Sequence, residues 1–106
     1  MDDLRAKRCL PCEGGVPKLD VAAITELLAA VPAWRVADDR LHRRYLFPHF
    51  MDGIRFIDRV AELAEAEGHH PDLAVHYRQV DVTIWTHAVG GLTENDFILA
   101  AKIDAL

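Results

Sequence analysis

Residues 68–87 read GHHPDLAVHYRQVDVTIWTH and contain the pattern that decides the fold. Two extended runs, residues 73–77 and 80–87, are separated only by an Arg-Gln pair, which predicts an antiparallel hairpin. The second run alternates between two sets of side chains that should face opposite ways: Val80, Val82 and Ile84 against Asp81, Thr83, Trp85 and His87. Such alternation is typical of an antiparallel sheet with one face on the core.

A second hairpin is predicted upstream, from residues 34–37 and 41–47. In its longer run, alternation separates Leu41, Arg43, Tyr45 and Phe47 from His42, Arg44 and Leu46. The polar turn Asp38-Asp39-Arg40 joins the two runs. Because its acidic residues adjoin the basic ones of this region, we interpret Arg40, Arg43 and Arg44 as part of a solvated strand edge.

Helices are expected before, between and after the hairpins. Asp20 is a suitable N-cap for a helix to about residue 30, whose apolar face is Val21, Ile24, Leu27, Leu28 and Val31. A longer helix over 49–67 carries a stripe of Phe50, Ile54, Ile57, Ala61 and Ala64, widened by Phe56, Val60 and Leu63, and Gly68 should end it.

The last helix has a capping box, with Thr93 as N-cap and Asp96 at the third helical position. The predicted order is therefore α-β-β-α-β-β-α. This order indicates an α+β fold, in which a four-stranded antiparallel sheet is covered on one face by helices.

The length of 106 residues predicts a single domain that spans residues 1–106. Within it, residues 1–15 are the segment whose composition is compatible with flexibility. The net charge of −5 argues against a general nucleic-acid binder, whose affinity depends on Lys and Arg at phosphates. No run is apolar enough for a signal peptide or a membrane span, so we expect a cytoplasmic protein without membrane contact.

Cys9 and Cys12 form one CxxC motif near the N-terminus. A structural zinc site normally needs four ligands, and a thioredoxin-type motif lies between a strand and a helix. Neither context is present in the sequence. A turn is the simpler interpretation, and a metal or redox role, completed by His42, His49 or another subunit, stays open.

Three of the six histidines form the candidate site. His69 and His70 follow the helix-ending glycine, and Pro71 should stiffen the corner that holds them. His87 ends a predicted strand. An imidazole, with an ordinary pKa near 6.5, exchanges protons near neutral pH. The residues alone indicate a proton-transfer or metal site, whereas His42, His49 and His76 are interpreted as structural.

The stretch Glu65-Ala66-Glu67-Gly68-His69-His70-Pro71, followed by Tyr77, His87 and Asp96, resembles the signature of the pterin-4a-carbinolamine dehydratase family. The Thr86-His87 and Gly91-Leu92-Thr93-Glu94 segments and the RCLPCEGG opening are also similar to the family. The resemblance implies a four-stranded antiparallel sheet with helices on one face. It also implies dehydration of 4a-hydroxytetrahydropterins to quinonoid dihydropterins, with pterin as the substrate and no cofactor.

By this resemblance His69 and His70 carry out acid-base catalysis, and His87 positions the pterin and assists proton transfer. Four further residues are candidates for supporting the site or binding substrate: Glu65, Pro71, Trp85 and Asp96. Asp96 is explained first by capping, Glu65 could hydrogen-bond a histidine, and Trp85 could flank a flat pterin. Asn95 departs from the family, which usually has a basic residue there.

The family resemblance also implies a homodimer or homotetramer and a link to aromatic amino-acid hydroxylases, whose cofactor is recycled. Two alternatives remain. The first is a non-catalytic interaction module, because relatives of the same fold act as a dimerisation cofactor or an assembly factor. A metal-binding protein that uses the same histidines or the CxxC motif is the other.

Overall fold

The computed structural model describes residues 3–11 and 15–106, and the described chain forms an α+β domain, as predicted. Its strands are β1 (Arg35–Ala37), β2 (Arg40–Leu46), β3 (Asp72–His76) and β4 (Gln79–Ile84). Its α-helices are α1 (Val21–Leu28), α2 (Phe50–Glu67) and α3 (Glu94–Asp104). Short 3-10 turns occur at η1 (Leu4–Ala6) and η3 (His87–Val89).

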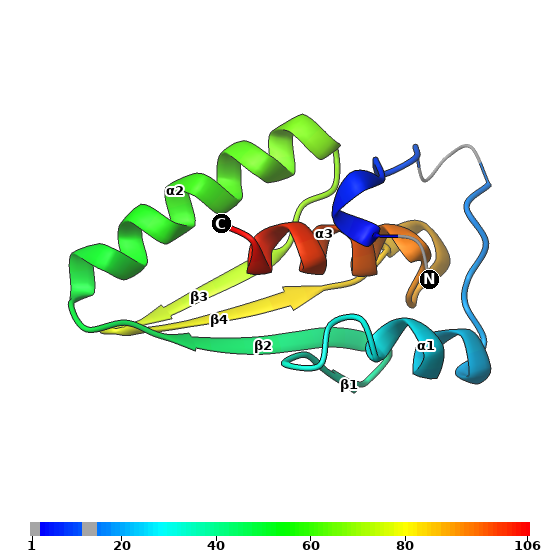
Figure 1. The fold of residues 1–106 in the computed structure, drawn as a ribbon, viewed down its shortest axis with the longest axis horizontal. Helices are drawn as coiled ribbons and strands as arrows, with labels where there is room; N and C mark the ends of the chain where they lie inside the picture. The colour runs from blue at the N-terminus through cyan, green and yellow to red at the C-terminus, as the bar shows by residue number, and fades with distance from the viewer. Residues whose placement is uncertain (1–2, 12–14) are drawn as a thin grey trace.

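The sheet is antiparallel, with strand order β1-β2-β4-β3, so the second hairpin inserts its later strand beside the first hairpin. The helices pack over one face, with α3 between α2 and α1 (Figure 1). This arrangement confirms the predicted layers. No described helix is long and apolar enough to cross a membrane.

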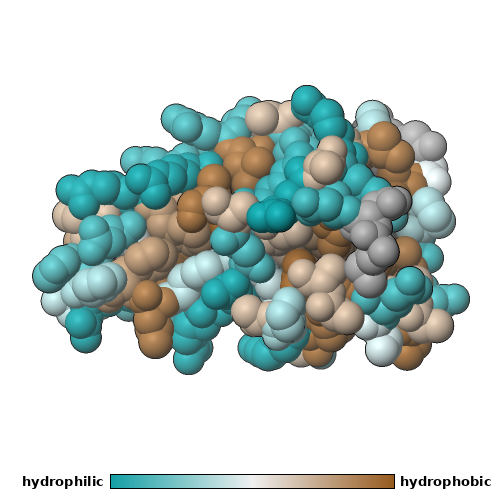
Figure 2. All heavy atoms as spheres, in the orientation of Figure 1, coloured by the Kyte–Doolittle hydropathy of each residue, from teal (hydrophilic) through white to brown (hydrophobic). Residues whose placement is uncertain are grey.

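The core lies between the sheet and the helices. Val80, Val82 and Ile84 are at most 1% exposed and point inward, as their alternation predicts. They meet Phe56, Val60 and Ala64 of α2 and a nearly all-buried α3, whose contributions include Phe97, Leu99, Ala100 and Ile103. The outward surface of α2 is hydrophilic (Figure 2).

The buried face of α2 is rotated by part of a turn from the predicted apolar stripe. Phe50 is 43% exposed and Ala61 is also exposed, whereas Gly53, Phe56, Val60 and Ala64 are buried. Gly53 permits this rotation, because a Cβ there would lie 3.3 Å from both Phe47 and Val80. The helix ends as predicted, with Gly68 in the left-handed region at φ 65°.

Helix α1 ends at Leu28, two residues before its expected end, and buries less than its pattern predicts. Val21 is 79% exposed, whereas Ile24, Leu27 and Leu28 are half-buried against the core. Asp20 caps the helix as expected, accepting a hydrogen bond from the Ala23 backbone at 2.8 Å. Val31, just beyond the helix, is the fully buried member of the set.

Candidate active site

The centre of the candidate site is a buried pair formed by His69 and Asp96. His69 Nε2 lies 2.6 Å from Asp96 Oδ1, and the two residues are 6% and 0% exposed. Gly68 ends α2 in a left-handed turn, which directs the chain inward and brings His69 to the start of α3. The contact fits an imidazole N–H that donates to the carboxylate oxygen.

The other oxygen of Asp96 is held by the loop that precedes α3. Asp96 Oδ2 accepts from the Thr93 backbone N–H at 2.8 Å and from the Thr86 hydroxyl at 2.9 Å. Thr86 and Thr93 are themselves linked through their hydroxyl oxygens at 2.9 Å. Asp96 therefore occupies the predicted capping position and also binds a histidine, so capping alone does not account for it.

His70 is exposed and contacts a different carboxylate from the one in this buried pair. Its Nε2 lies 3.0 Å from Glu65 Oε1, and the two side chains are 59% and 81% exposed. The Glu65 contact with a histidine is thus present, although an exposed pair of this kind contributes little to stability. Pro71 separates His70 from β3, which begins at Asp72.

The sequence predicted that His87 ends a strand, and this prediction is wrong. Strand β4 ends at Ile84, and His87 begins the 3-10 turn η3. The reason is Thr86, whose backbone bridges Gly91 and whose side chain turns inward to Asp96. His87 is exposed, and its ring stacks on Trp85 with centroids 3.8 Å apart and planes inclined by 27°.

The site residues come from three segments that meet at Asp96. The end of α2 supplies His69, the start of α3 supplies Asp96, and the β4–η3 connection supplies Thr86. Thr86 directly precedes His87, and His69 directly precedes His70. The buried hydrogen bonds of Asp96 thus connect the residues that directly precede the two exposed histidines, His70 and His87.

Glu67, at the end of α2, is bound both by α3 and by the N-terminal segment. Glu67 accepts from Lys102 at 2.8 Å and from the Cys9 backbone N–H at 2.8 Å. Burial alone would raise the pKa of Glu67, but these hydrogen bonds, with the charges of Lys102 and Arg8, outweigh it and lower the pKa. Glu67 is therefore ionised in the folded protein at neutral pH.

The CxxC motif lies only partly within the described residues, because Cys12 is outside them. Burial, then the charge and hydrogen bonding of Glu67, raise the pKa of the Cys9 thiol to about 12, so the thiol stays protonated at neutral pH. Asn95, at the position where the sequence departs from the family, binds the Leu10 backbone through both ends of its amide, at 2.9 and 2.7 Å. In the described part of the chain, no three His, Cys, Asp or Glu side chains converge as a metal site.

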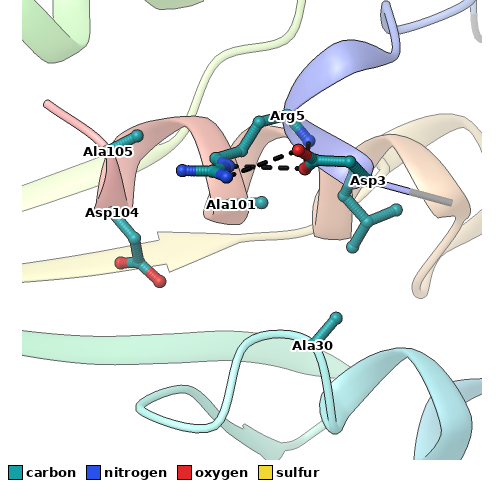
Figure 3. A pocket seen from close by; sticks show the side chains of 7 residues that line it. Asp3, Arg5, Ala30, Ala101, Asp104 and Ala105 are labelled. Carbon is teal, nitrogen blue, oxygen red and sulfur yellow. Dashed lines mark hydrogen bonds and ion pairs between the residues drawn. The ribbon is translucent and has the colours of Figure 1, made fainter. Parts of the chain in front are cut away.

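A cavity of about 410 Å³ lies between η1, α3 and the end of α1 (Figure 3). None of the seven predicted site residues lines it. Asp104 on its wall accepts hydrogen bonds from three residues beneath α3, namely Trp34, Arg43 and Tyr45. These bonds attach α3 to β2 and to the residue just before β1. We therefore assign Asp104 a role in stabilising the fold.

Two residues next to the predicted set were missed from the sequence. Thr86 continues the inward face of Val80, Val82 and Ile84 at a period of two, so the alternation itself could have placed it in the core. Arg40 lies over the Trp85 ring, with Cζ 4.3 Å from the centroid. Alternation along the strand, which groups Arg40 with His42 and Arg44, could have placed it on the sheet face that Trp85 shares with Asp81 and Thr83.

Comparison with known proteins identifies the family. Residues 17–106 match the family model described as pterin 4 alpha carbinolamine dehydratase. A relative from Halorhodospira halophila, provisionally named a pterin-4-alpha-carbinolamine dehydratase, is 48% identical over 97% of this chain and 96% of its own. The Arabidopsis thaliana protein named pterin-4-alpha-carbinolamine dehydratase 2, mitochondrial, is 49% identical over 98% of this chain and 59% of its own.

Solved structures agree with these sequence relatives. A Brucella melitensis structure, described as a transcriptional coactivator/pterin dehydratase, has a TM-score of 0.80 at 33% identity, covering 84% of this chain and 97% of its own. A pterin dehydratase-like protein described as a RuBisCO assembly factor in the alpha-carboxysome has a TM-score of 0.56 at 27% identity, covering 68% and 83%. The fold, the His-His-Pro corner and the matched length together show that this chain belongs to the pterin-4a-carbinolamine dehydratase family.

Proposed function

We propose that this protein dehydrates 4a-hydroxytetrahydropterins to quinonoid dihydropterins by histidine acid-base catalysis. The observation that carries the proposal is the buried His69–Asp96 pair beside the exposed His70 and His87. Membership of the family supports the choice of substrate. The geometry of the site supports proton transfer as the chemistry.

The reaction needs one proton delivered and one removed. An acid protonates the C4a hydroxyl, the C4a–O bond breaks, and water leaves. A base takes the proton from N5, and the electron pair of that N–H bond forms the C4a–N5 double bond. Proton delivery and removal balance, so imidazole groups can serve both steps and return to their starting states.

Asp96 suits the role of orienting His69. Its three bonds, from His69, Thr86 and Thr93, fix the carboxylate without solvent contact. The carboxylate in turn fixes which imidazole nitrogen is protonated and stabilises the imidazolium form if His69 takes up a second proton. Asp96 is therefore a positioning residue in this mechanism.

His70 and His87 are the groups exposed enough to meet a substrate that arrives from solvent. His70 shares the acid-base work with His69, and Glu65 steadies its ring through the 3.0 Å contact. His87 positions the pterin and assists proton transfer. Pro71 contributes rigidity at the corner, because its ring fixes the backbone next to His70.

The test is a dehydration assay with chemically prepared 4a-carbinolamine. His70→Ala should leave the fold intact and slow turnover by about 100-fold, the lower end of a general acid-base contribution. His69→Gln is preferable to alanine, because an amide can still donate to Asp96 but cannot exchange protons. Wild-type turnover in both variants would overturn the proposed mechanism, and an inactive wild type would overturn the proposed function.

A non-catalytic interaction module is the second candidate, and one surface favours it. Leu46, Tyr77 and Phe50 are 74%, 71% and 43% exposed near the β3–β4 turn, and the rings of Phe50 and Tyr77 stack with centroids 6.4 Å apart. Exposed apolar groups of this kind mark protein contacts.

We also propose that the protein forms a homodimer or homotetramer, for which the edge strands β1 and β3 are available, and that it recycles the cofactor of an aromatic amino-acid hydroxylase. Light scattering of the purified chain tests the assembly.

A further inference from the structure

The indole of Trp85 contacts two other side chains. The imidazole of His87 stacks on the ring, with centroids 3.8 Å apart, and the guanidinium carbon of Arg40 lies 4.3 Å from the ring centroid. Guanidinium groups bind aromatic faces by cation–π attraction. Arg40, Trp85 and His87, which we call the Arg40 stack, thus reach from the first hairpin to the candidate site.

The register of the sheet explains why Arg40 reaches Trp85. Leu41 pairs with Ile84, so the antiparallel ladder brings Arg40 opposite Trp85 one step further along. Arg40 directly follows the turn at Asp38 and Asp39, whose φ angles are 54° and 57°. Two consecutive positive φ values are those of a type I′ hairpin turn, which fixes the start of β2.

The edge of the indole does not hold it in place. Trp85 Nε1 is buried, and no described residue accepts a hydrogen bond from it. A buried unpaired donor costs about 1–3 kcal/mol. The ring is therefore held by its packing against the core and by its contacts with His87 and Arg40. A flat pterin stacked on the face of Trp85 that His87 covers would have to displace His87.

We propose that Arg40 and Trp85 are positioning residues for His87, and that Trp85 acts through His87 instead of flanking the substrate. This inference rests on the proposed function of His87. Trp85 restricts the imidazole to one plane, and Arg40 holds the indole through its cation–π contact. The outer face of His87 is left to solvent, where a substrate can approach.

The stack can be tested without turnover, by NMR of the histidine ring protons. Protons over an indole face are shifted upfield, so the His87 signals identify the stack. Arg40→Met and Trp85→Ala should move these signals toward the positions of an unstacked histidine, and Trp85→Phe should retain much of the shift because a phenyl ring still stacks. Arg44→Met is the matched control, since Arg44 lies on the same strand and pairs with Asp81 at 2.9 Å.

Turnover supplies the second measurement. We expect kcat/KM for the carbinolamine to fall about tenfold in Arg40→Met and Trp85→Ala, to recover in Trp85→Phe, and to stay near wild type in Arg44→Met. Unchanged His87 signals in Arg40→Met would overturn the stack, whatever the activity. Shifted signals with unchanged kcat/KM would overturn the positioning role. If the wild type is inactive but the His87 signals still move in the Arg40→Met and Trp85→Ala variants, the proposed function is refuted and the contacts of the Arg40 stack are supported.

Discussion

Replacing Asp96 by asparagine tests the centre of the site with the smallest change of shape. The amide can keep its oxygen toward Thr86 and Thr93, in the place of Oδ2. Its NH₂ group then faces His69 Nε2, where the wild type has an acceptor 2.6 Å away. His69 must rotate its ring or move its proton to the other nitrogen to restore a hydrogen bond.

The cost in stability follows from the three bonds that Asp96 accepts. A hydrogen bond to a charged group contributes about 1.5–3 kcal/mol and a neutral one about 0.5–1.5, so each bond weakens by about 1 kcal/mol. The sum for the three bonds, from His69, Thr86 and Thr93, is about 3 kcal/mol. A domain with 5–15 kcal/mol of stability would remain folded, so activity and stability can be measured on the same sample.

Urea unfolding and the carbinolamine assay measure the two effects. We expect Asp96→Asn to lower the unfolding free energy by about 3 kcal/mol and turnover by a factor on the order of 10²–10⁴, the range of general acid-base catalysis. Asp58→Asn, at an exposed position of α2, is the control and should change stability by less than about 0.5 kcal/mol. Wild-type turnover in Asp96→Asn would refute the argument that Asp96 orients a catalytic histidine.

Three further predictions concern the supports of the fold. The pKa of Glu67 is below its ordinary value of 4.5, so its ionised form stabilises the protein above that pH, and this contribution is lost as the pH falls through the folded-state value. Glu67→Gln should therefore be less stable than wild type at pH 7, with the difference narrowing below pH 4.5 in acid-denaturation series; a constant difference would contradict this. Asp104→Ala should lower the unfolding free energy by about 2–3 kcal/mol, because it leaves the Trp34 and Tyr45 donors unpaired in a partly buried site; an unchanged urea midpoint would count against it. Asp39→Gly should raise the melting temperature, since glycine removes the cost of about 1 kcal/mol that a left-handed residue carries in the β1–β2 turn; a lower melting temperature would show that the aspartate side chain matters more than its backbone.

The sequence predicted those parts of the fold that depend on local pattern. The alternation of Val80, Val82 and Ile84 predicted an inward strand face, Gly68 the end of α2, and Thr93 with Asp96 the start of α3. Each of these signals is complete within a few residues. The same holds for the order of the elements, because two hairpins with helices around them leave few compact arrangements.

The errors arose where long-range contacts decide the outcome. Strand β4 stops at Ile84 because Thr86 is bound by Asp96 and Gly91, neither of which is local to the strand. Arg43 and Arg40, interpreted as part of a solvated edge, instead contact Asp104 and Trp85. Likewise, His69 and Asp96 were both selected from the sequence, but only the packing of α2 against α3 reveals that they bind each other.

The N-terminal segment over residues 3–11 has a consequence for local opening of the molecule. Its apolar attachment is confined to Leu4, which is 4% exposed, and the half-buried Cys9, and its polar contacts include those of Cys9 with Glu67 and Leu10 with Asn95. A segment with little buried apolar surface can detach at a lower free energy than the whole domain unfolds. Glu67 lies two residues before His69, and Asn95 lies directly before Asp96. Each detachment of the segment therefore removes hydrogen bonds next to both members of the buried His69–Asp96 pair. Hydrogen exchange at the Cys9 and Leu10 amides would therefore report how often the candidate site loosens while the sheet stays intact.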